Sequence, residues 1–238
     1  AADKILSEDE QYDRYARVIE AMQGKPISIR LADIGADKAA RFLNLPPEDN
    51  PVLGYRGARL LLGHPELLVT QARALVRASA IAPINIIYPM IVDVQQFYTL
   101  REIFRQSTAD LGSAQIRHGV MFEVPAACIC AREILQAAEF GSIGSNDLIQ
   151  YLFAVDRDND LVAYDYNPDR PAFWRLLINI IEAAREAEAP LSFCGEMGGQ
   201  PQYLPKLMEI GIRTVSISSR LIGLARLTAR NYLGRHTT

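Results

Sequence analysis

The chain has 238 residues, of which 49% are hydrophobic and 22% charged, and its formal net charge is −3. This length allows one large domain or two small ones, and the composition excludes a disordered or collagen-like chain. The small net charge argues against a dedicated nucleic-acid-binding protein. Three cysteines are too few for a disulfide scaffold and favour a reducing, cytoplasmic environment. The most apolar stretch, residues 81–94, is too short to span a membrane, so we expect no membrane association.

The predicted elements alternate between helices and strands from the first residues onward. Ser7 can cap a first helix, Glu10 follows three residues later as in a capping box, and Gly24 ends the helix. In chain order, the first half contains a helix over 7–22, a strand over 26–33, an extended segment over 50–62, a helix over 65–80, a strand over 84–92, a helix over 93–107 and a strand over 116–124. The run 84–92 is almost continuously apolar, as is typical of a strand covered on both faces.

The second half continues the same alternation. It contains a helix over 125–138, a strand over 140–144, a helix over 146–155, a long loop over 156–171, a helix over 171–188, a strand over 191–196, a helix over 201–210, a strand over 213–218 and a helix over 219–230. Loops as long as 156–171 are uncommon in compact domains and are often functional.

Seven short strands with helices between most of them predict an α/β fold with a parallel sheet. An open doubly wound sheet and a closed (β/α)8 TIM-type barrel are both compatible with this order. No GxGxxG motif follows an early strand, and polar residues recur at strand ends, where a barrel would gather them on one face. We therefore expect a TIM-type barrel over residues 1–238 as a single domain. Because eight strands are usual, one strand, the first, is expected to be missing.

Two acidic residues stand in strongly apolar surroundings at strand ends. Glu123 ends the strand in GVMFEVP, and Asp147 follows the strand in IGSNDL. Buried carboxylates are costly unless they are paired or bind a cation, and two of them can hold Mg²⁺ together with water and a phosphorylated substrate. A buried ion pair for Glu123 and a helix N-terminal role for Asp147 remain the alternatives.

Arg30 and Arg56 are unusual because both lie in otherwise apolar segments, whereas Arg157 lies on the long loop. Guanidinium groups bind phosphate and carboxylate groups through paired hydrogen bonds, although each arginine could instead form a surface ion pair. Cys194, in FCGEMGG, ends another apolar strand. Its thiol could act as an acid, act as a nucleophile, or pack as a small apolar group.

Five motifs in one order carry a resemblance to a known family. LADIGADK, DNPVLGYRGAR, MFEVPAA, IGSNDLIQYLFAVDRDND and CGEMGG resemble the C-terminal, phosphoenolpyruvate-binding domain of phosphoenolpyruvate-utilising enzymes over about residues 5–230. The sequences of these motifs are most similar to those of the phosphoenolpyruvate–protein phosphotransferases, which include Enzyme I of the bacterial sugar phosphotransferase system and its nitrogen-related paralogue. Valine at position 124 of the MFEVPAA motif is slightly more similar to the nitrogen-related paralogue than to Enzyme I of the sugar system.

The resemblance implies a role for each matching residue. Glu123 and Asp147 match the magnesium ligands, and four residues match substrate contacts: Arg30, Arg56, Asn146 and Arg157. Cys194 matches the cysteine that handles the proton at the methylene carbon of the substrate. The implied enzyme transfers the phosphoryl group of phosphoenolpyruvate to a histidine of another domain and releases pyruvate.

The resemblance also implies what lies outside this sequence. A GLLRTEF-like strand with a further phosphate-binding arginine is absent, so we expect a fragment of a larger multidomain chain that binds substrate weakly by itself. None of the three histidines resembles the phosphorylated one, which belongs to an N-terminal domain that would serve a histidine phosphocarrier protein. A cytoplasmic homodimer is expected. A non-catalytic dimerisation or regulatory barrel, and the barrel of a pyruvate phosphate dikinase or phosphoenolpyruvate synthase, remain the alternatives.

Overall fold

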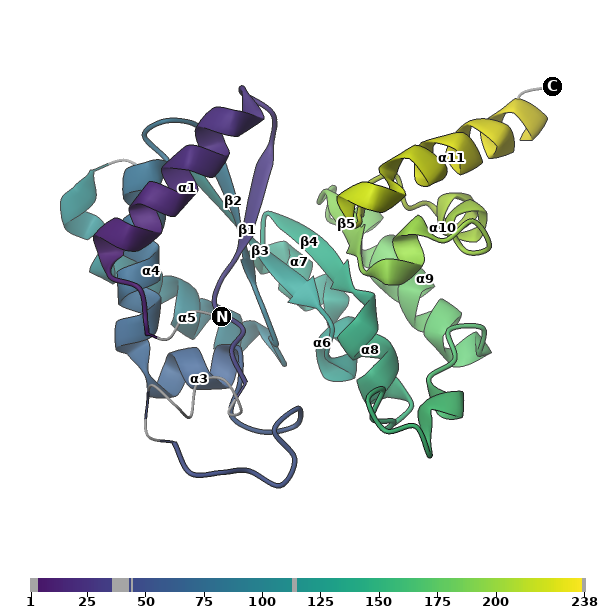
Figure 1. The fold of residues 1–238 in the computed structure, drawn as a ribbon, viewed down its shortest axis with the longest axis horizontal. Coiled ribbons are helices and arrows are strands. Elements are labelled where there is room, and N and C mark those ends of the chain that lie inside the picture. The colour runs from purple at the N-terminus through teal and green to yellow at the C-terminus, as the bar shows by residue number, and fades with distance from the viewer. Residues whose placement is uncertain (1–3, 36–42, 44, 113–114, 237–238) are drawn as a thin grey trace. The chain divides into compact units, whose positions relative to one another are not determined.

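The computed structural model describes residues 4–35, 43, 45–112 and 115–236. The chain divides into two compact units, Ala1–Val120 and Met121–Thr238, which are described separately below. The expected α/β class is confirmed: the strands are parallel and helices lie between them in the sequence (Figure 1).

The first unit is built on three parallel strands that pair in chain order: β1 (Ile27–Arg30), β2 (Ile84–Tyr88) and β3 (Ile116–Phe122), whose last two residues belong to the second unit. Ile84 is level with Ile27 on one side and with Ile116 on the other. The side chains of Ile84 and Ile86 are almost completely buried. The apolar run that predicted this strand is therefore explained by cover on both of its faces.

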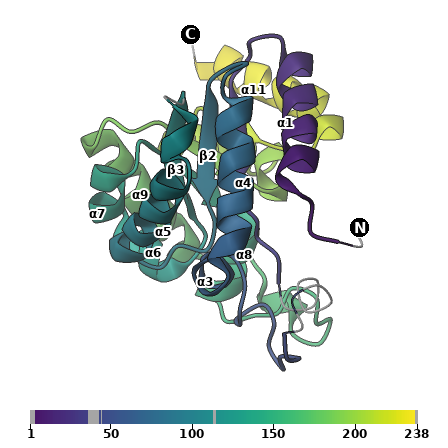
Figure 2. The ribbon, with the colours of Figure 1, turned by 90° about the vertical axis from the view of Figure 1, so that its left-hand side faces the viewer.

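Helices cover these strands. They are α1 (Glu8–Met22), α3 (Ala58–Gly63), α4 (Pro65–Ala78) and α5 (Val94–Ser107), followed by the short η1 (Ala109–Leu111). The predicted capping box is confirmed at the start of α1, where the side chains of Ser7 and Glu10 each bond the other's backbone N–H. Helices α1 and α4 lie side by side (Figure 2). Arg73 and Arg77 of α4 join them by ion pairs with Glu8.

The second unit repeats the arrangement. Its strands β4 (Phe140–Gly144), β5 (Leu191–Cys194) and β6 (Val215–Ser216) are parallel and pair in chain order. Its helices are α6 (Pro125–Ile129), α7 (Ala131–Ala137), α8 (Ser145–Leu152), α9 (Pro171–Glu186), α10 (Leu204–Ile210) and α11 (Ile222–His236), with short turns at η2 (Ala163–Asp165), η3 (Glu196–Gly199) and η4 (Ser219–Leu221). The core contains the fully buried rings of Phe122, Phe173 and Phe193.

The prediction of an extended segment over 50–62 is wrong. Residues 51–57 form turns, and the leucines after them lie in α3. Leu60 and Leu61 are completely buried in that helix. A short apolar run can be covered equally well as a helical turn or as a strand, so its composition alone did not distinguish the two. The described residues therefore contain six strands rather than seven.

Other boundaries differ by smaller amounts. The helix predicted over 125–138 is interrupted at Cys130, whose ψ of 29° separates α6 from α7. The helix predicted over 201–210 begins at Leu204, and the last helix extends to His236. Asp37 and Lys38 of the LADIGADK motif lie outside the described residues. Among the described helices, none combines the length and the apolar character that crossing a membrane requires.

The contact between the buried Tyr88 and the partly buried His118 makes the stability of the first unit sensitive to pH. Tyr88 Oη lies 3.0 Å from His118 Nδ1. Burial lowers the pKa of His118 from 6.5 to about 4, and the charges of Arg101 and Arg105 contribute to this decrease. An unfolded histidine takes up its proton near pH 6.5, whereas the folded one stays neutral until about pH 4. The free energy of unfolding should therefore fall, by up to about 3 kcal/mol, as the pH decreases through this window.

Urea unfolding at several pH values between about 4 and 7.5 measures this effect. His118→Asn keeps an acceptor for the Tyr88 hydroxyl but removes the titratable ring, so the decrease should shrink. His64→Asn is the matched control and should retain it. An unchanged pH dependence in His118→Asn would show that other groups cause the decrease.

Candidate functional site

Glu123 lies directly against the end of strand β4. Glu123 is 1% exposed and directly follows Phe122, the last residue of β3. A β-carbon placed on Gly144 would lie only 2.8 Å from Glu123 Oε2, so the carboxylate occupies the space that a side chain at position 144 would need. Glycine at the end of β4 therefore allows this close approach.

Asp147 stands three residues beyond Gly144, in the first turn of α8, and is 8% exposed. Its Oδ1 accepts a hydrogen bond from Arg157 Nη1 at 3.4 Å, and the same contact is an ion pair between the two side chains. The two predicted acidic residues are thus both buried at the junction of β4 and α8. Arg157 reaches this junction from the long loop, and its own backbone N–H donates to Gln150 Oε1 on α8 at 3.1 Å.

Cys194 ends the neighbouring strand β5, level with Gly144 in the parallel ladder. It is partly exposed, and its carbonyl oxygen accepts a hydrogen bond from Ser145 Oγ at 3.1 Å. Asn146 follows Ser145, and its Oδ1 would lie 3.1 Å from a β-carbon on Gly195. Five of the predicted site residues therefore belong to one cluster in the second unit, which we call the carboxylate cluster: Glu123, Asn146, Asp147, Arg157 and Cys194.

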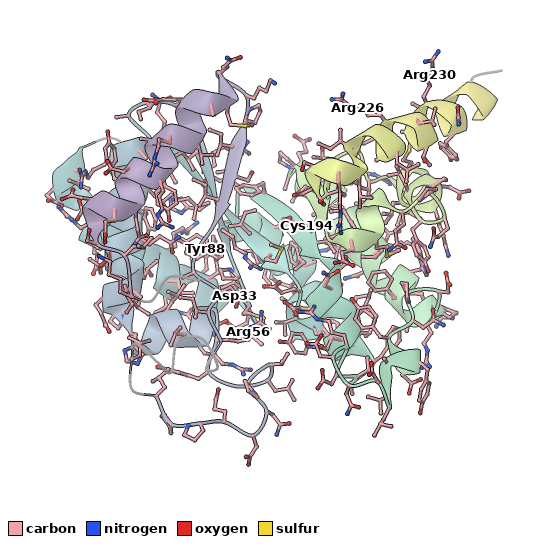
Figure 3. All side chains as sticks on the ribbon, in the orientation of Figure 1. Asp33, Arg56, Tyr88, Cys194, Arg226 and Arg230 are labelled. Carbon is pink, nitrogen blue, oxygen red and sulfur yellow. The ribbon has the colours of Figure 1, made fainter. Side chains whose placement is uncertain are left out.

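The two remaining predicted residues, Arg30 and Arg56, belong to the first unit and both pair with Asp33. Figure 3 labels Asp33 and Arg56. Arg56 donates two hydrogen bonds to this carboxylate, Nε to Oδ1 at 3.1 Å and Nη2 to Oδ2 at 2.7 Å. Arg30 Nη1 lies 3.3 Å from Oδ2. Arg30, Asp33 and Arg56 are called the arginine cluster below. It gathers two guanidinium groups around one carboxylate, and guanidinium groups are well suited to binding an anion.

A family model for the phosphoenolpyruvate-binding domain of phosphoenolpyruvate-utilising enzymes matches residues 1–233 of this chain. The chain belongs to this family. Curated relatives include the phosphoenolpyruvate-protein phosphotransferase of Bacillus subtilis, which is 41% identical over 230 residues, and that of Staphylococcus carnosus, 39% identical over 235 residues. These matches cover 94% and 96% of this chain but 40% and 41% of the relatives' length.

Solved structures with much lower sequence identity to this chain than the curated relatives share its fold. A citrate lyase from Burkholderia xenovorans superposes with a TM-score of 0.59 at 17% identity, over 94% of this chain and 75% of its own. An aldolase/citrate lyase family protein from Burkholderia cenocepacia gives a TM-score of 0.52 at 13% identity, over 99% of this chain and 94% of its own. At such identities the likeness concerns the fold alone.

The side chains of the carboxylate cluster have the type of ligand atoms that a hard divalent cation prefers. Both acidic residues offer oxygen ligands, which Mg²⁺ prefers, and Mg²⁺ commonly takes only one or two carboxylates from a protein. The described residues contain no group of three or more His, Cys, Asp or Glu side chains that could hold a metal by themselves. A divalent cation at Glu123 and Asp147 would therefore need further oxygen ligands, such as water, from outside these side chains.

Two residues in or beside the carboxylate and arginine clusters were not predicted as site residues. Asp33 is the last residue of the strand predicted over 26–33 and follows Arg30 by three residues, a spacing that is compatible with an ion pair. Tyr166 on the long loop gave no sequence signal; its hydroxyl donates to the carbonyl oxygen of Asn146 at 3.2 Å. Burial raises the pKa of the Tyr166 phenol, the charges of Asp147 and Glu196 add to this, and Arg157 opposes it. Tyr166 thus lies among the groups of the carboxylate cluster.

The close approach at Gly144 yields a test that needs no ligand. Gly144→Ala forces the buried Glu123 carboxylate and the Met121 side chain to move, because a β-carbon would lie 2.8 and 3.1 Å from them. Overpacking of this kind costs about 1–3 kcal/mol, and chemical denaturation measures it as a lower free energy of unfolding.

Gly223 provides the matched control, because it lies in α11 and a β-carbon added there would have nothing within 4 Å. Gly223→Ala should not lower the free energy of unfolding, because alanine favours a helix more than glycine does. If Gly144→Ala were equally harmless, the placement of Glu123 against β4 would be incorrect.

Proposed function

We propose that this chain is the phosphoenolpyruvate-binding, catalytic part of a phosphoenolpyruvate–protein phosphotransferase. Such an enzyme transfers the phosphoryl group of phosphoenolpyruvate to a histidine on another domain and releases pyruvate. The observation that carries the proposal is the pair of buried acidic residues, Glu123 and Asp147, at the junction of β4 and α8 beside Cys194. Relatives of that name, 41% and 39% identical, support it.

In this proposal the arginines bind the substrate. Phosphoenolpyruvate carries a phosphate and a carboxylate, and guanidinium groups match both. We assign Arg30 and Arg56 to these anionic groups, with Arg157 and Asn146 as further contacts. Phosphoryl transfer depends on positioning and charge stabilisation more than on covalent chemistry by the protein, so a site rich in arginine suits the reaction.

Glu123 and Asp147 would hold Mg²⁺. When bound, the ion would supply Lewis-acid stabilisation of charge on the substrate oxygens. In this assignment the Asp147 carboxylate would be shared between the ion and Arg157, whose Nη1 lies 3.4 Å from Oδ1. Asn146 precedes Asp147, and the Tyr166 hydroxyl fixes its carbonyl group. These neighbours would keep the first turn of α8 in place while the substrate binds.

Cys194 would move a proton. When the phosphorus–oxygen bond of phosphoenolpyruvate breaks and a phosphorus–nitrogen bond forms on the acceptor histidine, the remaining enolate needs one proton at its methylene carbon. The thiol of Cys194 would donate this proton to give pyruvate, and the thiolate would regain a proton from water. The partial exposure of Cys194 at the end of β5 is compatible with such access.

The remaining parts of the proposal concern the whole protein. We propose that residues 1–238 belong to a single domain of the TIM-type (β/α)8 barrel class. The parent protein would be a cytoplasmic homodimer of the bacterial phosphotransferase system, in its sugar or nitrogen branch, with an N-terminal domain that passes the phosphoryl group to a histidine phosphocarrier protein. A dikinase, a synthase or a non-catalytic barrel remain alternatives, but the named relatives are protein phosphotransferases.

The first functional test is substrate binding. In the intact protein, phosphoenolpyruvate should bind more tightly with Mg²⁺ present than in its absence, and its affinity should fall with added salt because arginines meet an anion. Arg56→Ala should weaken binding by about 2–4 kcal/mol, the usual cost of losing one buried charged contact. Isothermal titration calorimetry measures both effects.

Arg132→Ala is the control, because Arg132 forms an exposed ion pair with Glu186. It should leave the affinity unchanged. Equal affinity of the wild-type protein and Arg56→Ala would contradict the assignment of Arg56, and no detectable binding by the wild-type protein would contradict the proposed function.

The second functional test concerns the proton at the methylene carbon. Cys194→Ala should still bind phosphoenolpyruvate but should turn it over much more slowly, because the proton donor is gone. Water could still protonate the enolate, without preference for one face. With phosphoenolpyruvate labelled at the methylene carbon and the reaction run in deuterated water, the chirality of the pyruvate methyl group reports this loss.

Cys130→Ala is the matched control, since this cysteine is exposed and lies in the turn between α6 and α7. It should keep the normal rate and face selectivity. If Cys194→Ala also kept both, the thiol of Cys194 would be only a packing group.

A further inference from the structure

We propose that Asp33 is a positioning residue, which orients Arg56 and Arg30 for a substrate that carries both a phosphate and a carboxylate and does not itself touch that substrate. This inference rests on the proposed function. The side chain of Asp33 is only 2% exposed, whereas those of Arg56 and Arg30 are 13% and 44% exposed. The carboxylate thus lies beneath two guanidinium groups that are more accessible than it is.

The geometry around Asp33 fixes the plane of the Arg56 guanidinium. The two hydrogen bonds from Nε and Nη2 run to different oxygens of one carboxylate, at 3.1 and 2.7 Å. Such paired bonds set both the position and the orientation of a guanidinium group. Arg30 shares the Oδ2 atom at 3.3 Å, so one carboxylate links both arginines.

The backbone around Asp33 is itself held in place. Gln71 of α4, which is 7% exposed, accepts a hydrogen bond from the Ala32 N–H at 2.8 Å. The Gln71 amide donates to the carbonyl oxygen of Arg30 at 3.4 Å and to the Tyr15 hydroxyl at 3.0 Å. Asp33 is therefore a fixed point against which Arg56 is oriented.

The segment that carries Arg56 is anchored on both sides. The backbone N–H of Tyr55 donates to the two oxygens of Glu48 at 2.9 and 3.2 Å. Gly57 has a φ of +54°, and a β-carbon there would lie 2.6 Å from the side chain of Met90, so this turn requires glycine. Since backbone and side chain are both fixed, the entropy cost of ordering Arg56 is met during folding rather than on substrate binding.

Charge alone would make Asp33 harmful to an anion site. Two arginines and one carboxylate give the arginine cluster a net positive charge, which would be larger without Asp33. Removing the carboxylate should therefore tighten the binding of any anion if only Coulomb attraction mattered. If orientation matters more, removal should weaken the binding of phosphoenolpyruvate, which must place two groups at once. The sign of the change distinguishes the two possibilities.

The experiment measures the dissociation constants of phosphoenolpyruvate and of inorganic phosphate for the intact protein by calorimetry, in the presence of Mg²⁺. Asp33→Asn should weaken phosphoenolpyruvate binding by about 10- to 100-fold. Inorganic phosphate, which needs no second group positioned, should bind equally well or more tightly. Asp33→Glu keeps the charge but moves the carboxylate, and it should also weaken phosphoenolpyruvate binding. If urea denaturation shows that Asp33→Asn does not fold, Asp33→Glu carries the test.

A double-mutant cycle with Arg56→Ala tests whether Asp33 acts through Arg56. In the Arg56→Ala background, Asp33→Asn should have a clearly smaller effect on the affinity, because only the contact of Asp33 with Arg30 remains to be lost. The control is Asp110→Asn, because Asp110 receives two hydrogen bonds from Arg73 in the same way but on the surface. It should change neither affinity.

The outcomes separate this inference from the proposed function. A wild-type protein that does not bind phosphoenolpyruvate overturns both. A wild-type protein that binds, with an Asp33→Asn variant that binds phosphoenolpyruvate equally well or more tightly, overturns the positioning role alone. The same conclusion follows if the effect of Asp33→Asn is undiminished in the Arg56→Ala background.

Discussion

A carboxylate that is buried in a protein must be compensated by hydrogen bonds or by a nearby cation, because its hydration is lost. This constraint shapes both clusters of the chain. Asp33 is compensated by Arg56 and Arg30, and Asp147 by Arg157. In each case a buried acid near the end of a strand fixes a more accessible arginine. The same interactions that make burial of the acids tolerable therefore place cationic groups where an anionic substrate could meet them.

The parallel strands explain why these groups occur where they do. In a parallel sheet the interior of each strand is covered on both faces and is mostly apolar, which favours polar side chains near the strand ends. Arg30 is the last residue of β1, Cys194 is the last of β5, and Glu123 directly follows β3. Gly144 then allows Glu123 to approach the end of β4 closely, where α8 begins. Small residues at strand ends are thus as important to the site as the charged ones.

Family membership and fold carry different weight in this argument. The citrate lyase from Burkholderia xenovorans shares the fold at 17% identity, and a shared fold supports many chemistries. The family model matches almost the whole chain, and the Bacillus subtilis relative is 41% identical. The function proposed for this chain therefore depends on the motifs and on the clusters they form, and not on the fold.

The sequence alone determined the α/β class and the capped first helix, because apolar runs and capping residues are local signals. Charged side chains in apolar segments are local signals too, and they led to the proposal of Glu123, Asp147, Arg30 and Arg56 as site residues. The sequence did not determine that residues 51–63 form turns and a helix, since three consecutive leucines can be buried in either kind of element. Nor could it assign Asp33 to Arg56, or Tyr166 to Asn146, because these partners are separated by 23 and 20 residues. Only the tertiary structure decided those pairs, since a hydrogen bond between distant residues depends on how the strands and loops between them fold.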